Sequence, residues 1–520
     1  MKKIATALLS CALAAATLAG CAANAAQVPQ ESQEPHTAAL TATAAASVKS
    51  PKYVFLFIGD GMSYPQIQST SDYLGALKDA DYWQAQPSLD DNQGAILDGP
   101  EYLNFMNFEA AGSAVTYDSN SFAPDSASTA TSISTGHKTY SGSINVDETG
   151  TIEYETIAEQ LKAQKGWEIG VITSVNLNHA TPAAFYAHQA SRSSYYEIGL
   201  ELVESGFDYF AGGGLLKPTG SSGDQTDLYE LAQEAGYTVA KTHAEADVIG
   251  TNTEKAIIID EDLADSDAMA YELDRTDDMW ALADYVAKGI EVLDNDTGFF
   301  MMCEGGKIDW ACHANDAASS IHDTQALADA VQVAIDFAKE HADETLILVT
   351  GDHETGGLTI GFAGTDYDTY LDLLENQKIS FAKYDSDYVA SYKANKPPFG
   401  TVLADIEKLF GLKAQGEEGD KLVLTAYEME QLRAAYEKSI NGTASSQYDQ
   451  AEYVLYGTYE PLSVTITHII NNKSGISFTS YSHTGLPVAV LAEGAGSEMF
   501  NGYYDNTDIY NKLADLLNIA

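Results

Sequence analysis

Five short apolar runs mark the predicted strands of this chain. They cover residues 53–58, 170–175, 299–303, 345–350 and 488–491. Continuous apolar runs of this length are typical of strands buried on both faces of a parallel sheet. Helical patterns lie between and after these runs, at residues 155–165, 276–293, 316–341 and 507–517. This alternation predicts an α/β fold with a central, mostly parallel sheet flanked by helices on both faces.

Polar residues gather where the predicted strands end. The first four runs are followed by residues 59–62 (Gly-Asp-Gly-Met), 178–182 (Asn-His-Ala-Thr-Pro), 304–313 and 351–354 (Gly-Asp-His-Glu). In a parallel α/β sheet the ligand site lies beyond the carboxyl ends of the strands. We therefore expect these polar residues to converge on one crevice. The same parallel pattern is expected to resume with the strand at 488–491, after a loop that contains His483.

A helix is predicted to begin near Ser126. Pro124 opens a run of small residues that continues to Gly136, and proline is common in the first turn of a helix. Unpaired backbone N–H groups and the positive end of the helix dipole favour an anion beside the Ser126 hydroxyl. That hydroxyl needs a metal or a base to act as a nucleophile. The alternative interpretation is that Asp125 and Ser126 only cap the helix.

Five of the remaining polar residues are of the types that bind zinc. Asp309 and His313 are four positions apart, so on a helical turn they face the same direction. Asp352 and His353 are adjacent at a strand end, and His483 lies in a loop before a strand. Zinc prefers histidine nitrogen and carboxylate oxygen, and a catalytic zinc keeps one position open. Together with Ser126, these residues favour a metal site over a set of unrelated hydrogen-bonded turns.

The charge of the chain restricts its partners. The sequence has 27 basic and 76 acidic residues, for a net charge of −49. Nucleic acids and anionic membrane surfaces need basic protein surface, so neither is an expected partner. An anionic substrate would need local positive charge from metal ions or from a lone arginine.

The N-terminal residues predict export. Residues 1–20 form a basic start followed by an Ala/Leu-rich run, which is typical of a signal peptide. Residues 18–21 (Leu-Ala-Gly-Cys) resemble a bacterial lipobox, which implies cleavage before Cys21 and a lipid on its sulfur. An ordinary signal-peptide cleavage site is the alternative. We expect a protein of the cell envelope that contacts a membrane, on the periplasmic side or at the cell surface, only through the lipid on Cys21.

The rest of the chain divides into a tether and one folded domain. Residues 21–50 are rich in Ala, Thr and Gln without periodicity and predict a flexible tether. Residues 51–520 are expected to form the folded domain. Within it, residues 361–472 lose the strand–helix alternation, and we interpret them as an insertion that caps the crevice and serves substrate access or dimer contacts.

Two cysteines lie in the stretch that holds the candidate ligands. Cys303 ends a predicted strand, and Cys312 stands next to His313. A disulfide between them is open in an exported protein, and so are two buried free thiols, which we favour.

The motifs, in this order and spacing, resemble those of the alkaline phosphatases. The resemblance covers most of the chain from Tyr53 onward, outside the inserted region. It rests on Gly59–Met62, Pro124–Ala127, His179–Pro182 with Arg192 downstream, Glu304–His313, Thr350–His353 and His483–Gly485. It implies a homodimeric phosphomonoester hydrolase that acts on small phosphate monoesters through a phosphoserine intermediate on Ser126.

The resemblance also implies two zinc ions and one magnesium ion. One zinc would be held by Asp309, His313 and His483, and the other by Asp60, Asp352 and His353, with Ser126 as a further ligand. The magnesium would be held by Asp60, Thr181 and Glu304. Arg192 would grip the phosphate, and Asp125 would orient Arg192.

Some positions depart from the best-studied bacterial pattern. His179 stands where some members have an aspartate, so we expect weaker magnesium binding. Trp310 stands where some members have a lysine, so we expect weaker phosphate contact. His188 is expected to be structural, and Lys307 to be solvated.

Three other functions stay open as alternatives. A sulfatase needs a Cys/Ser-x-Pro-x-Arg motif, but Ser126 is followed by Ala-Ser-Thr-Ala. A phosphodiesterase usually lacks an arginine for a dianionic phosphate, so Arg192 favours monoesters. A metal-binding or adhesive lipoprotein without enzymatic activity has only the acidic charge in its favour.

Overall fold

The structure is a computed structural model that describes residues 50–79, 96–442 and 444–519. The predicted signal peptide, Cys21 and the predicted tether up to residue 49 lie outside the described residues. In the described ranges we find no helix with the length and apolar character needed to cross a membrane.

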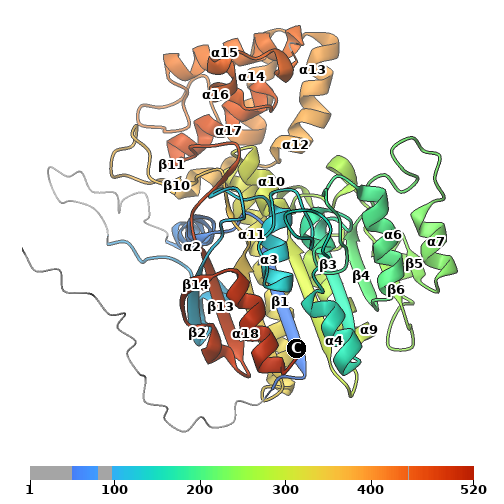
Figure 1. The fold of residues 1–520 in the computed structure, drawn as a ribbon. Coiled ribbons are helices and arrows are strands. Elements are labelled where there is room, and N and C mark those ends of the chain that lie inside the picture. The colour runs from blue at the N-terminus through green and yellow to red at the C-terminus, as the bar shows by residue number, and fades with distance from the viewer. Residues whose placement is uncertain (1–49, 80–95, 443, 520) are drawn as a thin grey trace, which may run out of the picture. The chain divides into compact units, whose positions relative to one another are not determined.

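A ten-stranded sheet forms the centre of the folded domain (Figure 1). Its strand order is β14-β2-β13-β8-β1-β7-β3-β4-β6-β5. The strands are β1 (Tyr53–Gly59), β2 (Ala110–Val115), β3 (Glu168–Asn176), β4 (Tyr209–Gly213), β5 (Thr238–Ala240), β6 (Ala256–Ile259), β7 (Phe299–Gly305), β8 (Thr345–Gly351), β13 (Val488–Gly494) and β14 (Gly502–Asp505). The prediction of a mostly parallel central sheet is confirmed.

The expectation of a parallel strand at 488–491 was wrong. β13 runs antiparallel to both of its neighbours, β8 and β2. The reason is the position of His483 in the short strand β12 (His483–Thr484), which pairs with β9 (Glu354–Thr355) just beyond the end of β8. Only a few residues separate β12 from β13, so β13 must start at this edge of the sheet and run back through it.

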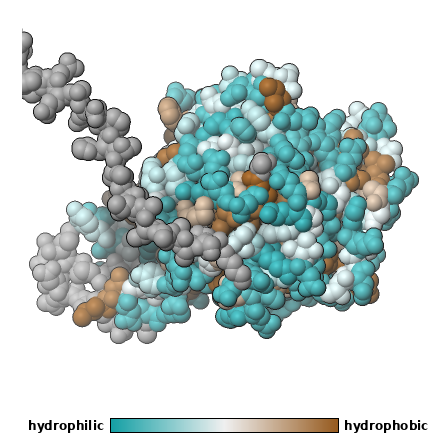
Figure 2. Space-filling view, turned by 60° about the horizontal axis from the view of Figure 1, so that its bottom comes forward, coloured by the Kyte–Doolittle hydropathy of each residue, from teal (hydrophilic) through white to brown (hydrophobic). Residues whose placement is uncertain are grey.

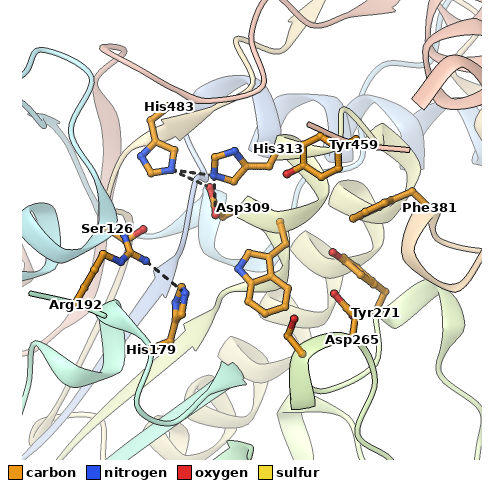
Figure 3. A pocket seen from close by; sticks show the side chains of 12 residues that line it. Ser126, His179, Arg192, Asp265, Tyr271, Asp309, His313, Phe381, Tyr459 and His483 are labelled. Carbon is orange, nitrogen blue, oxygen red and sulfur yellow. Dashed lines mark hydrogen bonds and ion pairs between the residues drawn. The ribbon is translucent and has the colours of Figure 1, made fainter. Parts of the chain in front are cut away.

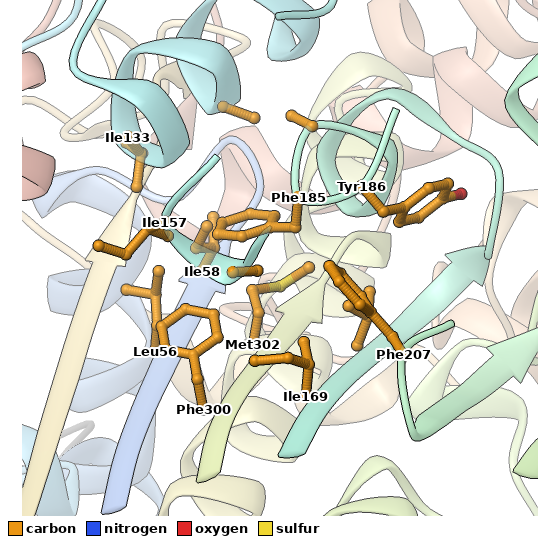
Figure 4. Close-up of a cluster of buried hydrophobic side chains, with 14 of the residues drawn as sticks. Leu56, Ile58, Ile133, Ile157, Ile169, Phe185, Tyr186, Phe207, Phe300 and Met302 are labelled. Atoms are coloured by element: carbon orange, nitrogen blue, oxygen red, sulfur yellow. The ribbon is translucent and has the colours of Figure 1, made fainter. Parts of the chain in front are cut away.

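The central strand β1 is buried along its whole length. It pairs in parallel with β7 and β8. Because successive side chains of a strand point to opposite faces, Leu56 and Ile58 join one hydrophobic cluster and Phe55 and Phe57 join another. Figure 4 shows the first cluster, where Leu56 and Ile58 lie among side chains of neighbouring strands and helices. Burial on both faces explains why the sequence run is apolar without alternation.

Helices cover both faces of the sheet. On the first face lie α3 (Ser126–Thr135), α4 (Ile157–Lys165), α6 (Tyr195–Ser205), α7 (Leu228–Glu234) and α18 (Thr507–Leu517). On the second lie α2 (Tyr64–Lys78), α9 (Leu282–Leu293) and α11 (Ala317–Glu340). The predicted helices at 155–165, 276–293, 316–341 and 507–517 correspond to α4, α9, α11 and α18. Shorter helices are α5 (Ala180–Ala183), α8 (His243–Ala246) and α10 (Lys307–His313).

Residues between the short strands β10 (Thr359–Ile360) and β11 (Ile476–Ser477) form a helical layer with its own hydrophobic cluster. Its helices are α12 (Phe381–Tyr384), α13 (Ala390–Asn395), α14 (Phe399–Phe410), α15 (Ala426–Asn441), α16 (Gln450–Tyr456) and α17 (Pro461–Ser474). Figure 1 shows this layer at the top of the view, above the sheet. Ile321 at the start of α11 and Tyr73 of α2 belong to the same cluster, which joins the layer to the helices that cover the sheet.

Both described cysteines of the ligand-bearing stretch are buried free thiols, as we favoured. Cys303 lies in β7 and Cys312 in α10, where its sulfur is 3.2 Å from Ser320 Oγ.

The surface differs from the buried core in its polarity. Figure 2 shows a face that is mostly hydrophilic with isolated hydrophobic patches, as expected for a strongly acidic chain.

His188 is structural in this fold, because it joins two helices through their carboxylates. Its Nε2 atom lies 3.5 Å from Glu159 of α4, and its Nδ1 atom lies 3.4 Å from Glu201 of α6. Burial alone would lower the pKa of His188, but hydrogen bonds to Glu159 and Glu201 outweigh it and raise the pKa to about 10. The folded protein therefore prefers a charged imidazolium at this position.

We predict that His188→Gln makes the stability difference from the wild type dependent on pH. The folded-state pKa lies above the unfolded value of 6.5, so the stabilisation is complete below pH 6.5 and is lost as the pH approaches 10. Urea unfolding should show a loss of about 2 kcal/mol at pH 6 that shrinks toward pH 10. A difference that stays constant over this range would contradict the assignment.

Candidate active site

Ser126 is the first residue of helix α3, at the carboxyl edge of the sheet. The preceding residue, Asp125, is the N-cap, and its Oδ1 atom accepts a hydrogen bond of 3.1 Å from the backbone N–H of Ser128. The Oδ2 atom of Asp125 lies 2.8 Å from an Arg192 guanidinium nitrogen. Asp125 thus makes both the cap and the arginine contact that the sequence left as alternatives. The pair fixes Arg192 next to the start of the helix.

One cluster of metal-type ligands joins α10 to the short strand β12. His313 Nε2 lies 3.3 Å from Asp309 and 3.1 Å from His483 Nε2, and His483 Nε2 lies 3.5 Å from Asp309. The Nδ1 atoms face backbone carbonyls at 2.6 Å, Tyr481 for His313 and Pro124 for His483. When Nδ1 donates to these carbonyls, the neutral form of each ring has Nε2 as its acceptor, and the two Nε2 atoms face each other and a carboxylate.

A second cluster contains the serine. His353 Nε2 lies 3.3 Å from Asp60 and 3.2 Å from Asp352. The Ser126 hydroxyl is 3.2 Å from the same nitrogen and 3.4 Å from Asp60 Oδ1. Gly61 makes the turn possible, because its φ of +72° suits glycine. Its N–H donates to Asp352 Oδ1 at 3.1 Å.

The two clusters lie against each other. The rings of His353 and His483 stack with centroids 3.6 Å apart. Thr355 donates a hydrogen bond of 2.5 Å to Asp309 in the first cluster, and its hydroxyl oxygen lies 3.3 Å from His353 Nδ1 in the second. The serine, both histidine clusters and the intervening carboxylates therefore form one continuous site.

A third group of oxygen atoms adjoins Asp60. Thr181 donates from its hydroxyl to Asp60 Oδ2 at 3.4 Å, and Thr173 donates to Glu304. Glu304 is fully buried, and its Oε1 atom has no hydrogen-bond partner among the described residues. A set of buried oxygen acceptors suits a hard cation such as magnesium.

The site opens into a cavity of about 380 Å³. Figure 3 shows Ser126, Arg192 and His179 on one side of it, next to His313 and His483. His179 Nε2 lies 3.4 Å from an Arg192 nitrogen, and its ring is 5.9 Å from that of Trp310. Both residues that depart from the bacterial pattern therefore lie at the cavity, beside the arginine and the ligands.

Burial and mutual repulsion disfavour the ionised form of three carboxylates of the site, Asp60, Asp352 and Glu304. Burial raises the pKa of Asp60 well above its usual range, and Asp352, Asp309 and Glu304 raise it further by repulsion. Burial also raises the pKa of Glu304 to about 7 and that of Asp352 to about 6. The protein alone does not supply enough positive charge for this group.

The histidines of the site differ in their preferred charge. Burial lowers the pKa of His353 well below its usual range and that of His179 to about 3, so both are neutral. Burial would also lower the pKa of His313, but the attraction of Asp309 outweighs it and raises the pKa to about 9. A metal ion at the first cluster would thus displace a proton from His313.

These residues fit divalent cations. Each cluster offers one atom from each of three residues within 4.8 Å of one another, as a metal ion requires. Imidazole nitrogen with carboxylate oxygen is the donor set of zinc sites. The Glu304 Oε1 atom without a donor and the repulsion among the carboxylates both favour positive charge at this place.

The sequence placed Glu354 among the polar residues at a strand end without a role, and it did not predict Thr129 or Thr355 at the site. Thr129 donates to Asp352 at 3.0 Å, one helical turn after Ser126. Glu354 is buried, accepts a hydrogen bond of 2.9 Å from Gln66 and another from Thr484 beside His483. The available signals were adjacency for Glu354 and Thr355, which follow His353 directly, and helical spacing for Thr129.

Lys307 is buried, and the expectation of a solvated side chain was wrong. Its Nζ atom lies 2.6 Å from Asp265, 4.1 Å from the centroid of the Tyr271 ring and 4.7 Å from that of Trp310. Burial lowers the pKa of Lys307, and the charge of Asp265 opposes this effect. The contact with Asp265 is 42 positions away in the chain, which is why the local sequence did not reveal it.

The chain is similar to known proteins over most of its length. A family model described as alkaline phosphatase matches residues 51–519. Alkaline phosphatase 4 of Bacillus subtilis is 30% identical over 473 residues, which cover 89% of this chain and 88% of that protein. The crystal structure of a cold-active alkaline phosphatase from Shewanella sp. is similar with a TM-score of 0.70 and 28% identity, over 89% of this chain and 99% of that one.

A further solved structure is also similar to this chain. It is a histidine-to-glutamate mutant of the alkaline phosphatase of the Antarctic bacterium TAB5, with magnesium bound in a site called M3. It is similar with a TM-score of 0.59 and 25% identity, over 91% of this chain and 99% of that one.

We predict that Asp60→Asn stabilises the metal-free protein. The folded-state pKa of Asp60 lies above its unfolded value of 3.8, so its charge destabilises the fold increasingly as the pH rises above 3.8. After chelation, chemical unfolding at pH 8 should show a gain of about 1 kcal/mol or more over the wild type. The exposed Asp343→Asn is the control and should change stability by less than about 0.5 kcal/mol.

With zinc and magnesium restored, Asp60→Asn should be less stable than the wild type, because it lacks a ligand for the ions that stabilise the folded state. A metal-free Asp60→Asn variant that is less stable than the metal-free wild type would contradict this account of the site.

Proposed function

This chain belongs to the alkaline phosphatase family of phosphomonoester hydrolases, and we propose that it releases phosphate through a covalent phosphoserine intermediate on Ser126. The observation that carries the proposal is the position of the Ser126 hydroxyl. It lies within 3.4 Å of ligand-type atoms of Asp60 and His353, in the cavity that Arg192 also lines.

The substrate phosphate would bind at the start of helix α3. Arg192 offers forked N–H donors that match two phosphate oxygens, which a lysine cannot reproduce. Burial would lower the pKa of Arg192, but Asp125 raises it, so the guanidinium stays charged. Asp125 also limits the motion of the guanidinium through its contact of 2.8 Å. The positive end of the α3 dipole adds a favourable field for the same anion.

Ser126 would attack the phosphorus atom from within this arrangement. Its Oγ atom forms the bond to phosphorus as the ester oxygen leaves, and a water then hydrolyses the phosphoserine and frees the serine. The Ser126 side chain is buried, so the hydroxyl is held rather than solvated. Because the hydroxyl is already held beside the phosphate site, the reaction step does not lose the translational and rotational entropy of bringing two free reactants together.

We assign the metal ligands by cluster. Asp309, His313 and His483 would hold one zinc, and Asp60, Asp352 and His353 a second. When bound, the ions supply positive charge that lowers the pKa of the serine and water nucleophiles and offsets the charge of the transferred phosphoryl group. Two features of the protein suit these ions. His353 is neutral, and the Nε2 atoms of His313 and His483 lie close to Asp309.

A magnesium ion would take Asp60, Thr181 and Glu304, with the partnerless Oε1 of Glu304 as the supporting feature. His179 would weaken this third site relative to an aspartate, because its Nε2 atom faces Arg192. The TAB5 mutant holds magnesium in a site called M3, which supports a magnesium ion in an enzyme of this fold.

The setting of the enzyme is part of the proposal and rests on the sequence. We propose export with a lipid on Cys21, a homodimer, and small phosphate monoesters as substrates.

We predict that Ser126→Ala lowers kcat for 4-nitrophenyl phosphate by about 10³-fold or more, because the nucleophile is lost. The matched control is Ser132→Ala in the same helix, whose buried hydroxyl donates to the Ser128 carbonyl and does not line the cavity. That variant should keep kcat within about threefold of the wild type.

When turnover of a monoester labelled on its phosphate is quenched, the label should be recovered on the wild-type protein and on Ser132→Ala, but not on Ser126→Ala. Full activity of Ser126→Ala would refute the serine mechanism. A wild-type enzyme that prefers bis(4-nitrophenyl) phosphate to the monoester would favour the phosphodiesterase alternative.

A further inference from the structure

The cavity has a second half that the proposed chemistry does not use. Four aromatic side chains line it: Tyr271, Trp310, Phe381 and Tyr459. We call these four residues the aromatic wall. Figure 3 shows the rings of Tyr271, Phe381 and Tyr459 on the side of the cavity opposite Ser126 and Arg192. A bound phosphate at Arg192 would therefore direct its ester group toward the aromatic wall.

The rings of the aromatic wall brace one another. Phe381 meets Tyr271 edge to face at 5.7 Å and Tyr459 at 5.9 Å between ring centroids. Tyr459 in turn stacks on Tyr481 at 6.1 Å, whose backbone carbonyl holds His313. The wall is thus fixed before any ligand enters, so a flat partner would lose little free energy to reorganisation.

A buried positive charge lies behind the aromatic wall, and a carboxylate neutralises it. The Lys307 ammonium lies behind Tyr271 and Trp310 and pairs with Asp265. This cation stiffens both rings by cation–π contact and presents no free positive charge to the cavity. A leaving group with its own negative charge would find the carboxylate of Asp265 at the cavity instead.

The wall also contains an unused donor. Tyr271 is 1% exposed and lines the cavity, yet its hydroxyl group has no hydrogen-bond partner among the described residues. A buried hydroxyl without a partner is costly. Because the oxygen itself is closed off from solvent, a ligand in the cavity meets the Tyr271 ring and not its hydroxyl.

We infer that the aromatic wall selects phosphate monoesters whose uncharged leaving group carries a flat ring. This inference rests on the proposed function, because the phosphate must be held at Ser126 and Arg192. The shared chemistry is an aromatic ring that stacks on or packs against the wall. The ring can belong to an aryl ester or to the base of a nucleoside monophosphate.

Two substrate pairs test the inference, each with the same type of ester oxygen. Benzyl phosphate is compared with cyclohexylmethyl phosphate, and adenosine 5′-monophosphate with ribose 5-phosphate. The wild type with zinc and magnesium should show a kcat/KM ratio of about tenfold in favour of the aromatic member of at least one pair. A preference in the first pair identifies aryl esters, and one in the second identifies nucleotides.

The ratio should fall toward one in Phe381→Leu and in Tyr459→Leu. A ratio within one preparation is insensitive to the fraction of folded enzyme, so modest destabilisation does not mimic the effect. Tyr427→Leu is the matched control, because Tyr427 is 69% exposed on α15 of the helical layer and does not line the cavity. Its ratio should equal that of the wild type.

Ratios near one for both wild-type pairs, or ratios unchanged in both wall variants, would overturn the inference while the proposed function stands. A wild type that hydrolyses none of the four esters would overturn the proposed function itself, and the inference with it.

Discussion

The site depends on one constraint, which is that several carboxylates are held together out of water. Asp60, Asp309, Asp352 and Glu304 are all buried at the carboxyl edge of the sheet. Backbone and hydroxyl donors such as Gly61, Thr129 and Thr355 satisfy part of their acceptor capacity. Like charges at this spacing cannot all ionise in a dry site without added positive charge. The neutral His353 and His179 and the partnerless Glu304 oxygen are consistent with cations as the missing component.

The fold assembles this site from strand ends far apart in the chain. β1, β7 and β8 are adjacent and end in register, so Gly59 pairs with both Gly305 and Gly351, and the polar residues that follow meet at one edge. β12 brings His483 to the same edge through its pairing with β9. Helix α3 adds Ser126, and the helical layer adds Phe381 and Tyr459 to the cavity. Ligands, nucleophile and aromatic wall thus come from separate elements with one meeting point.

The sequence was informative where a local pattern has a single structural meaning. Doubly buried strands need uninterrupted apolar runs, so residues 53–58 could be assigned to the sheet, and Asp60 and Asp352 could be placed at its edge. The direction of β13 depends on where the preceding loop is anchored, which no local pattern encodes. Lys307 was misjudged because its partner Asp265 is distant in the chain. Phe381 and Tyr459 come from a segment with weak periodicity, so their common location could not be foreseen.

The central claim is that cations complete the carboxylate and histidine clusters. Its most direct test is a crystal structure of the zinc-loaded protein with anomalous data collected on both sides of the zinc absorption edge. The account predicts two zinc peaks, one bounded by Asp309, His313 and His483 and the other by Asp60, Asp352 and His353, with Ser126 at the second. No zinc peak at these clusters, or zinc peaks only at surface residues while these side chains stay as they are, would contradict it.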